Sequence, residues 1–360
     1  MEKELDIQSF LSLAETIPVI DVRSPAEFEI GHIPGAFNLP LFNNEERAIV
    51  GTLYKQKGRN EAVLAGLDIV GPKMSSLVNE SKKIAVNNEV LVHCWRGGMR
   101  SGSFCWLMNT VGIKATTLKK GYKAYRQHVL QSFEKELQII ILGGETGSGK
   151  TEILKFVRAT GEQVIDLEGF ANHKGSSFGA IGQEPQPRPE QFENDLAKHW
   201  NTLDPERRVW LEDESKNIGR VFIPDALWNQ MKLAPIIRVN VPKSERIKRL
   251  VKEYGTFDKK ILQVAIERIQ KRLGGQWVKR SIEALEAGDM ATVADITLVY
   301  YDKAYNYNHE LRKMEGVHFL EVEQDDPELN AKKVLAFADE KLSQKQLSHK
   351  SEEMAKEKQI

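Results

Sequence analysis

The sequence has few cysteines and no long apolar run, and each absence excludes a class of protein. Cys94 and Cys105 are the two cysteines among 360 residues, too few for a disulfide-built fold or a cysteine-based zinc site. No apolar run reaches the roughly 18 residues of a membrane span. The opening segment MEKELDIQSF also lacks the basic-then-apolar order of a signal peptide. We therefore expect a cytoplasmic protein without a membrane partner.

The chain also lacks net charge, because 51 basic residues balance 51 acidic ones. Taken alone, this balance argues against a nucleic-acid partner. The charges are unevenly placed, however, since residues 90–133 carry seven bases and no acid, while residues 315–328 carry six acids and no base. Placement indicates partners better than total charge does. We therefore expect a polarised surface whose basic side is continuous with the Cys94 segment.

A second basic run covers residues 243–280 and is interleaved with the aromatic residues Tyr254, Phe257 and Trp277. Such a run can neutralise phosphates and stack on splayed bases. A solvated helix face explains it equally well.

Apolar runs and segments with helical spacing alternate along the chain, which is typical of parallel α/β sheets. A length of 360 residues favours two domains. We predict one α/β domain over residues 1–134, a second over 138–345, a boundary inside a connecting helix near 134–137, and a polar tail over 346–360. Basic helices are expected over about 243–287. Strands are predicted at residues 17–22, 89–94, 138–143, 163–167, 208–212, 235–241 and 295–300.

Cys94 stands where a predicted strand ends and the loop CWRGGMR begins. Gly97 and Gly98 let several N–H groups point inward, which creates an anion site and lowers the pKa of a thiol. The N-terminus of the following helix adds to this field, so we predict a nucleophilic thiolate. Cys105 lies mid-helix among apolar neighbours, and core packing is expected for it. The remaining members of the Cys94 loop are Trp95, Arg96, Gly97, Gly98, Met99 and Arg100.

Residues 144–151, GETGSGKT, match the phosphate-loop (P-loop) pattern, with a predicted strand before them and a predicted helix after them. Lys150 can reach a terminal phosphate, and Thr151 can ligate Mg²⁺. The pattern predicts a site for a diphosphate or polyphosphate and does not specify a nucleotide. The P-loop consists of Gly144, Glu145, Thr146, Gly147, Ser148, Gly149, Lys150 and Thr151.

Acidic residues at strand ends are candidate partners for Mg²⁺ at this loop. Asp166 ends one predicted strand, and Glu212, Asp213 and Glu214 follow another. Either set can hold the ion through water, although capping of the next helix is the alternative. His173 and Lys174 in the loop that follows are candidates for orienting substrate, and a lone histidine is more often structural. No tightly bound metal or cofactor is expected.

Residues 21–40, DVRSPAEFEIGHIPGAFNLP, resemble the N-terminal signature of rhodanese domains at every fixed position. This resemblance covers residues 5–130 and implies that Cys94 handles transferred sulfur or selenium. With the fused P-loop and the segments DLEGFANHKGSSFG, LEDES and YYDKAYNY, nearly the whole chain resembles the tRNA 2-selenouridine synthase family. The implied fold is a rhodanese-like parallel-sheet domain followed by a P-loop NTPase-like α/β domain.

The resemblance implies a two-step reaction on tRNA that carries 2-thiouridine at the wobble position. Geranyl diphosphate first alkylates the thiocarbonyl sulfur, and selenium from selenophosphate then replaces the geranylthio group. Both compounds are implied co-substrates, Mg²⁺ is a candidate ion, and an enzyme that makes selenophosphate is a candidate partner. Cys94 would either carry selenium as a selenosulfide or position the donor at its anion site. Trp95 would stack on a base, close the pocket or simply pack.

Two other functions share these motifs. An ATP-dependent sulfurtransferase or kinase acting on a small molecule needs no surface for a polyanion. A nucleotide-gated sulfur carrier forms no RNA product. The P-loop sequence leaves open whether the site takes a nucleotide or only geranyl diphosphate.

Overall fold

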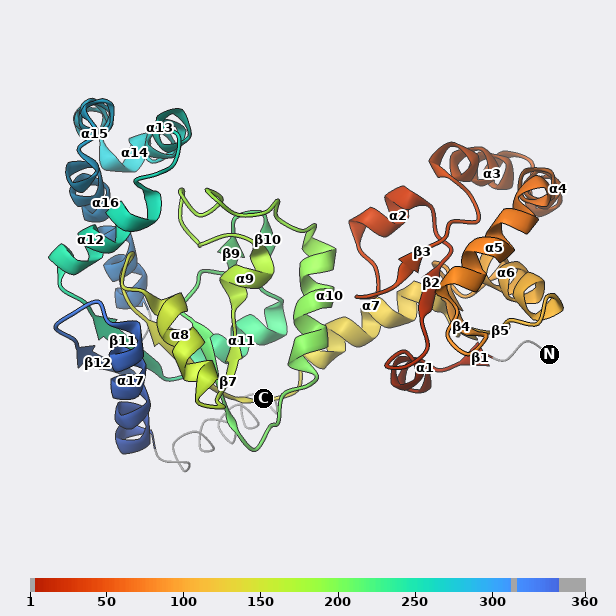
Figure 1. The fold of residues 1–360 in the computed structure, drawn as a ribbon, viewed down its shortest axis with the longest axis horizontal. Helices are drawn as coiled ribbons and strands as arrows, with labels where there is room; N and C mark the ends of the chain where they lie inside the picture. Colours follow the sequence, from red (N-terminus) through yellow and green to blue (C-terminus); the bar gives the residue numbers. More distant parts are fainter. Residues whose placement is uncertain (1–3, 312–315, 343–360) are drawn as a thin grey trace. The chain divides into compact units, whose positions relative to one another are not determined.

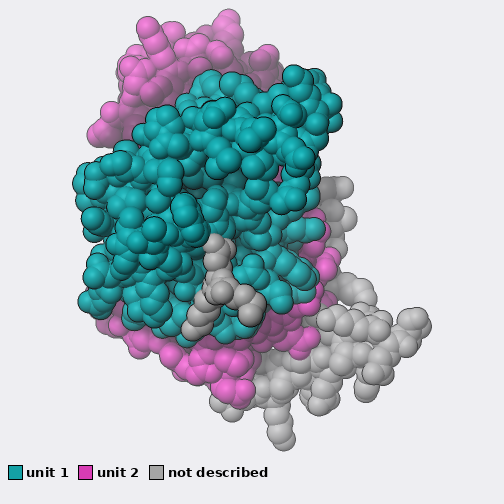
Figure 2. Space-filling model, turned by 90° about the vertical axis from the view of Figure 1, so that its right-hand side faces the viewer, with its two compact units in different colours: residues 1–132, 188–198 teal, residues 133–187, 199–360 magenta. Residues whose placement is uncertain are grey.

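The computed structural model describes residues 4–311 and 316–342 and divides into two compact units (Figures 1 and 2). The connecting helix ends at Ser132, before the boundary expected at 134–137. Segment 188–198 groups with the first unit, whereas the sequence placed it in the second domain. The polar tail expected over 346–360 lies outside the described residues. Unit 1 comprises residues 1–132 and 188–198, and unit 2 comprises residues 133–187 and 199–360.

Unit 1 is built around a parallel sheet with the strand order β1-β5-β4-β2-β3. Its strands are β1 (Glu4–Leu5), β2 (Val19–Asp21), β3 (Phe37–Asn38), β4 (Glu89–His93) and β5 (Lys114–Leu118). Its helices are α1 (Ile7–Leu13), α2 (Pro25–Ile30), α3 (Asn44–Gln56), α4 (Arg59–Val70), a 3₁₀ turn (Gly71–Lys73), α5 (Met74–Ile84), α6 (Met99–Thr110), α7 (Gly121–Ser132) and most of α10 (Pro189–Trp200).

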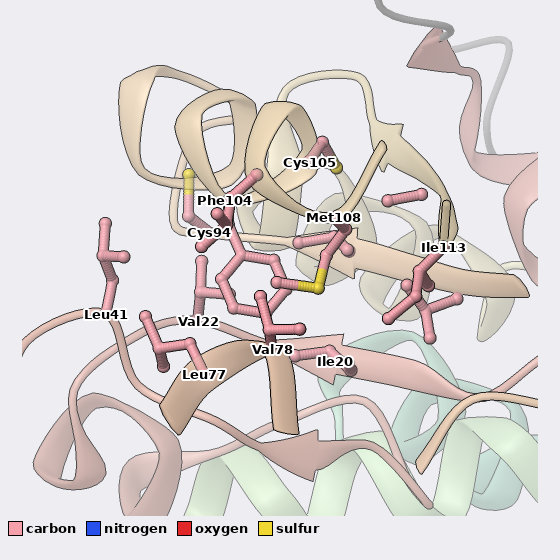
Figure 3. Packing of buried hydrophobic residues seen from close by; sticks show 14 of the residues in the cluster. Ile20, Val22, Leu41, Leu77, Val78, Cys94, Phe104, Cys105, Met108 and Ile113 are labelled. Atoms are coloured by element: carbon pink, nitrogen blue, oxygen red, sulfur yellow. The ribbon is translucent and has the colours of Figure 1, made fainter. Parts of the chain in front are cut away.

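The two faces of this sheet are set by alternation along β4, because successive side chains of a strand point to opposite sides. Val92 and Cys94 pack with α5 and α6 in a core that also contains Cys105 (Figure 3). His93 points to the other face, where its ring centroid lies 5.9 Å from that of Tyr122 on α7. Cys105 is fully buried, which confirms the predicted core role.

Helix α10 is held in unit 1 by buried polar contacts. Asn194 is almost completely buried and donates to the Tyr122 hydroxyl at 2.8 Å and to the His32 carbonyl at 2.9 Å. The Tyr122 hydroxyl donates in turn to Glu190 at 2.9 Å. Because a buried polar group that loses its partner costs stability, these contacts fix the helix to α7.

Unit 2 contains a second parallel sheet, with the order β12-β11-β6-β8-β7, and a small antiparallel pair. Its strands are β6 (Gln138–Gly143), β7 (Gln163–Ile165), β8 (Arg208–Glu212), β9 (Asn217–Ile218), β10 (Val221–Phe222), β11 (Ile236–Asn240) and β12 (Val317–Glu321). Its helices are α8 (Lys150–Ala159), α9 (Leu167–Ala171), α11 (Asp225–Leu233), α12 (Lys243–Tyr254), α13 (Lys259–Arg268), α14 (Gln270–Leu273), α15 (Gly275–Ala287), α16 (Met290–Leu311) and α17 (Pro327–Lys341).

Strand β6 lies at the centre of this sheet and leads directly into the P-loop. Helices α8 and α17 lie side by side on one face (Figure 1), where Ile140 and Leu142 of β6 pack against Ile153 and Val157 of α8. Because all five strands are parallel, their carboxyl ends meet at one edge of the sheet. The P-loop and the acidic ends of β7 and β8 therefore share that edge, as expected for an α/β fold.

Six of the predicted strands are present, and the basic helices expected over 243–287 are confirmed as α12 to α15. The strand predicted at 295–300 is wrong, because this segment lies inside α16. Val293, Thr297 and Tyr301 recur every four residues and share one helix face, on which the first two are buried and Tyr301 is partly buried. That face packs against neighbouring helices, and this packing overrides the strand propensity of the β-branched residues.

Candidate functional site

Cys94 lies at the end of β4 with 3% of its surface exposed. Its sulfur accepts the Gly98 N–H at 3.4 Å and lies 3.2 Å from the Ser101 hydroxyl. Burial raises the pKa of the Cys94 thiol, but the bonds from Ser101 and Gly98, with the charge of Arg100, bring that pKa below its ordinary value. The loop therefore favours the thiolate more than bulk water does.

The Cys94 loop packs closely on the loop that precedes α7. A Cβ atom on Gly97 would lie 2.7 Å from the Leu118 carbonyl oxygen, and one on Gly121 would lie 2.3 Å from the Cys94 carbonyl oxygen. Both glycines also have positive φ, 62° and 56°, which side chains disfavour. The Cys94 carbonyl accepts the Tyr122 N–H at 2.8 Å. Backbone packing therefore sets the shape of the Cys94 loop.

Residues of the 21–40 segment pack against Tyr122, which lies next to the Cys94 loop. Arg23 is fully buried and donates to Asp21 at 2.6 Å and to the Gly31 carbonyl at 2.7 Å. Its guanidinium carbon lies 3.7 Å from the centroid of the Tyr122 ring. The ring of Trp95 lies 5.8 Å from that of Tyr122 and keeps 37% of its surface exposed. Trp95 thus packs on one side and remains accessible on the other.

The basic segment 90–133 is less basic in the fold than in the sequence. Arg100 pairs with Glu27, Lys114 with Glu89, and Arg126 with Glu190 and Glu193. Three of the seven bases of this segment are therefore paired, because acids from other parts of the chain lie against them. The four remaining bases are exposed, have no ion pair to a described residue, and form what we term the basic rim: Arg96, Lys119, Lys120 and Lys123.

The basic rim borders the Cys94 loop. A Cβ atom on Gly97 would approach the Lys120 nitrogen at 2.8 Å, and the Lys123 N–H donates to the Trp95 carbonyl at 3.0 Å. Met99, a member of the Cys94 loop, is also exposed. The expected link between positive charge and Cys94 is therefore present, although it involves four bases and not seven.

In unit 2, a cavity of about 1240 Å³ lies at the P-loop. Gly147 and Gly149 have φ of 80° and 73° and turn the loop around it. The Lys150 ammonium donates to the Gly144 carbonyl at 2.9 Å, and the Thr151 hydroxyl donates to Glu168 at 3.1 Å. Helix α8 begins at Lys150, so its N-terminal N–H groups are available to an anion.

Of the P-loop residues, Glu145 does not line this cavity, and Ser148 lines it with almost none of its surface exposed. Glu145 is absent from the described lining and pairs with Arg238 and Arg246. Ser148 is buried, and its hydroxyl has no partner among the described residues. A Cβ atom on Gly144 would lie 2.5 Å from that hydroxyl, so the two residues pack tightly at the start of the loop.

The predicted acids divide between the cavity wall and the layer beneath it. Asp166 and Asp213 line the cavity, and Asp166 also caps α9 by accepting the Gly169 N–H at 2.6 Å. Glu212 is fully buried and accepts the first N–H of α9 at 2.9 Å. Burial, together with the charges of Glu168 and Asp166, raises the pKa of Glu212 well above its ordinary value. One Glu212 oxygen has no partner among the described residues.

Sequence reasoning missed Glu168 and Tyr305, which both line the cavity. The Tyr305 hydroxyl accepts the Gly144 N–H at 2.7 Å and donates to Asp213 at 3.0 Å. Burial and the charge of Asp213 raise the pKa of Tyr305, so this hydroxyl stays protonated. The four-residue spacing of Tyr301 and Tyr305, which places both on one helix face, was the available signal.

The candidate substrate loop is only partly at the cavity. Lys174 lines it and pairs with Glu253. His173 is absent from the described lining. Its ring packs against Gly179, on which a Cβ atom would lie 2.8 Å from the ring. Burial lowers the pKa of His173, as expected for a structural histidine.

The second basic run is partly paired with acids of unit 2. Tyr254 is buried, with its ring centroid 5.8 Å from that of Phe178, so it is not free to stack on RNA bases. Trp277 is exposed, with Arg280 over its ring. Five bases of the run pair with acids: Lys243 with Asp295, Arg246 with Glu145 and Asp302, Lys248 with Glu245, Arg249 with Asp325, and Lys279 with Glu283. An acid of the same unit therefore offsets the positive charge of these five bases, and the interpretation of the run as a nucleic-acid surface stays a prediction.

The residues present at the P-loop suit Mg²⁺ that arrives with a phosphate ligand. Within residues 4–311 and 316–342, no three His, Cys, Asp or Glu side chains are grouped to hold a metal. Mg²⁺ bound to phosphates needs only one or two protein ligands, with water completing its shell. Thr151 and Glu168, whose oxygens lie 3.1 Å apart, would supply them, and the ion would neutralise phosphate charge.

Comparison with known proteins assigns both halves of the chain. Residues 137–329 match the family model described as tRNA 2-selenouridine synthase AAA domain, and residues 6–128 match the rhodanese-like domain. The chain belongs to the tRNA 2-selenouridine synthase family. It therefore has a rhodanese-like N-terminal domain and an AAA/P-loop-like C-terminal domain, as the sequence predicted.

Individual relatives of this family match over most of the chain. The tRNA 2-selenouridine synthase of Sulfurovum sp. strain NBC37-1 is 38% identical, with 81% of this chain and 89% of that protein covered. That of Nitrosomonas eutropha is 34% identical, with 86% and 79% covered. A crystal structure of the N-terminal domain of a putative ATP/GTP binding protein from Clostridium difficile 630 is 40% identical over 36% of this chain and 99% of that one, with a TM-score of 0.33.

Among the described residues, no helix has both the length and the apolar character needed to cross a bilayer.

Proposed function

We propose that this protein is a tRNA 2-selenouridine synthase that acts in two steps on tRNA with 2-thiouridine at the wobble position. In the first step, the thiocarbonyl sulfur attacks C1 of geranyl diphosphate, the C1–O bond breaks, and diphosphate leaves. In the second, selenium from selenophosphate replaces the geranylthio group at C2. The observation that carries the proposal is the joint presence, in one member of this family, of a P-loop cavity and a thiol at an anion site.

The first step suits unit 2 because its charge develops on the departing diphosphate. Lys150 and the N-terminal N–H groups of α8 lie together at the P-loop and would bind that diphosphate. Tyr254, Tyr301 and Tyr305 line the cavity, and an aromatic wall would limit the access of water to an allylic cation. Alkylation converts a thiocarbonyl, a poor leaving group, into a thioether that leaves readily. Unit 2 therefore prepares the base for exchange.

The second step suits the Cys94 loop because its donor is also an anion. Selenophosphate already carries selenium at the selenide level, so its selenium can attack C2 while the geranylthiolate leaves. Water then cleaves the Se–P bond and releases phosphate. A selenosulfide on Cys94 would require a two-electron oxidation of selenium, and release of ordinary phosphate takes up no electrons. We therefore favour a Cys94 loop that positions the donor, with the Cys94 thiol, whose pKa is lowered, passing a proton to the geranylthiolate.

The two steps separate genetically. Cells lacking the protein are complemented with wild type, Cys94→Ala, Lys150→Ala or the control Cys105→Ala, and their wobble nucleosides are analysed by mass spectrometry. Cys94→Ala is expected to lose 2-selenouridine and retain geranylated 2-thiouridine, whereas Lys150→Ala loses both products. Cys105→Ala retains both, since Cys105 serves only the core. Full 2-selenouridine in the Cys94→Ala strain would refute the role given to that residue.

A further inference from the structure

A small apolar chamber adjoins the P-loop cavity in unit 2. The chamber has a volume of about 50 Å³. Its mouth is shared with the larger cavity, because the same five residues line both: Thr146, Ser176, Leu250, Tyr254 and Tyr301. Thr146 belongs to the P-loop itself. A ligand whose phosphates occupy the P-loop can therefore extend directly into the chamber.

The deeper wall of the chamber is a hollow in the helical core of unit 2. Leu262 and Val293 belong to the core cluster formed by α12, α13, α15 and α16, and Phe178 and Met290 pack against it. The remaining polar group there, the Thr297 hydroxyl, donates to a backbone carbonyl of its own helix at 2.8 Å. None of the described residues that line the chamber is charged. The residues found only in this deeper wall are Phe178, Leu262, Met290, Val293, Ala294 and Thr297.

The contrast between the two spaces indicates the shape of the ligand. The P-loop cavity offers Lys150 and the N-terminal N–H groups of α8 to an anion, whereas the deeper wall of the chamber offers hydrocarbon. A nucleotide base would need polar partners, and the deeper wall has one polar side chain among the described residues, Thr297, whose hydroxyl already donates to a backbone carbonyl. We propose that the chamber binds the far end of the hydrocarbon chain of a prenyl diphosphate and selects a ten-carbon chain. This inference rests on the proposed function for the identity of the diphosphate.

The volume of the chamber sets the chain length. A water-sized group needs about 10–15 Å³ of this kind of space, so 50 Å³ holds about four such groups, on the order of one five-carbon unit. In a geranyl chain, the first unit then lies at the shared mouth, beside Leu250, Tyr254 and Tyr301, and the second fills the chamber. A five-carbon chain ends before the chamber, and a fifteen-carbon chain exceeds it.

Binding of prenyl diphosphates to the full-length protein tests this assignment without tRNA. Geranyl diphosphate is expected to bind at least tenfold more tightly than dimethylallyl diphosphate or farnesyl diphosphate, as measured by calorimetry. The affinity for inorganic diphosphate, which has no hydrocarbon chain, measures binding at the P-loop alone. Equal affinity of wild type for all three chain lengths would overturn the proposal.

Two variants change the chamber in opposite directions. Ala294→Leu adds bulk at a buried wall position and is expected to reduce geranyl diphosphate affinity at least tenfold, with the affinity for inorganic diphosphate unchanged. Ala291→Leu makes the same change at an exposed position of the same helix and serves as its control. Met290→Ala enlarges the chamber and is expected to shift preference toward farnesyl diphosphate at least fivefold.

The outcomes separate this proposal from the proposed function. Selectivity for geranyl diphosphate without any RNA product would contradict the proposed function and support the role of the chamber. Geranylated tRNA formed with no chain-length preference would support the proposed function and contradict the role of the chamber. If Ala294→Leu also loses affinity for inorganic diphosphate, that substitution has disturbed the fold. The chain-length preference of Met290→Ala then decides whether the chamber selects the chain. An unchanged preference in Met290→Ala would count against the chamber.

Discussion

Arg100 donates a 2.7 Å hydrogen bond to Glu27, a residue 73 positions earlier in the chain, and forms an ion pair with it. Glu27 belongs to the 21–40 segment, where it also completes the cap of α2 by accepting the Ser24 N–H at 3.0 Å. Arg100 belongs to the loop that surrounds the Cys94 thiol. The pair therefore anchors the loop and offsets a positive charge that would otherwise act on the sulfur.

Removal of the Glu27 charge is expected to lower the pKa of Cys94 further. In Glu27→Gln, Arg100 keeps its charge and loses its counter-ion, so the thiolate becomes more favourable. The pH dependence of Cys94 alkylation by iodoacetamide, resolved from Cys105 by peptide mass spectrometry, measures this shift. Glu29→Gln, at an exposed position of the same helix, is the control. A Cys94 pKa that rises in Glu27→Gln would contradict this prediction.

Glu212→Gln is expected to stabilise the protein at pH above about 5. The pKa of Glu212 is raised in the fold, so the folded state binds its proton more tightly than the unfolded state does. Stability is then greatest below the unfolded pKa, ordinarily near 4.5, and falls as pH rises toward the folded pKa. Glutamine keeps the shape and removes this loss.

Thermal unfolding between pH 5 and pH 8 measures this effect. The gain in midpoint of Glu212→Gln over wild type should grow with pH, by roughly 2–4 °C for each kcal/mol relieved. Glu206→Gln, at an exposed site before the same strand, should show no such trend. A gain that shrinks as pH rises would contradict the burial argument.

The basic rim is expected to contact tRNA phosphates. In the double variant Lys119→Ala and Lys123→Ala, the slope of log affinity against log salt should fall by about 1.5–2, because each phosphate contact contributes close to one. Filter binding of deacylated tRNA at several salt concentrations measures it. Lys114→Ala, whose lysine pairs with Glu89, should leave the slope unchanged. No tRNA binding by wild type at low salt would favour the small-molecule alternative.

Local sequence was enough to predict the two motifs and most of the sheet. The Cys94 loop and the P-loop depend on glycines and on a strand followed by a helix, which all lie within about ten residues of one another. The strand prediction for segment 295–300 was wrong because its β-branched residues suit a strand as well as a buried helix face. Only the packing of α16 decided between the two. The sequence did not indicate that segment 188–198 groups with unit 1, because its partner there, Tyr122, lies far away in the sequence.

The total of 51 acids and 51 bases follows from the sequence, but only the fold shows which of these charges lie close enough to pair. The sequence by itself determined the thiol at a strand end, the phosphate loop and the family, because their chemistry is carried by contiguous residues. The tertiary structure alone decided which bases remain unpaired beside Cys94 and that an apolar chamber adjoins the P-loop. Both depend on distances between residues that the chain brings together from far apart, and such distances are not written in local sequence.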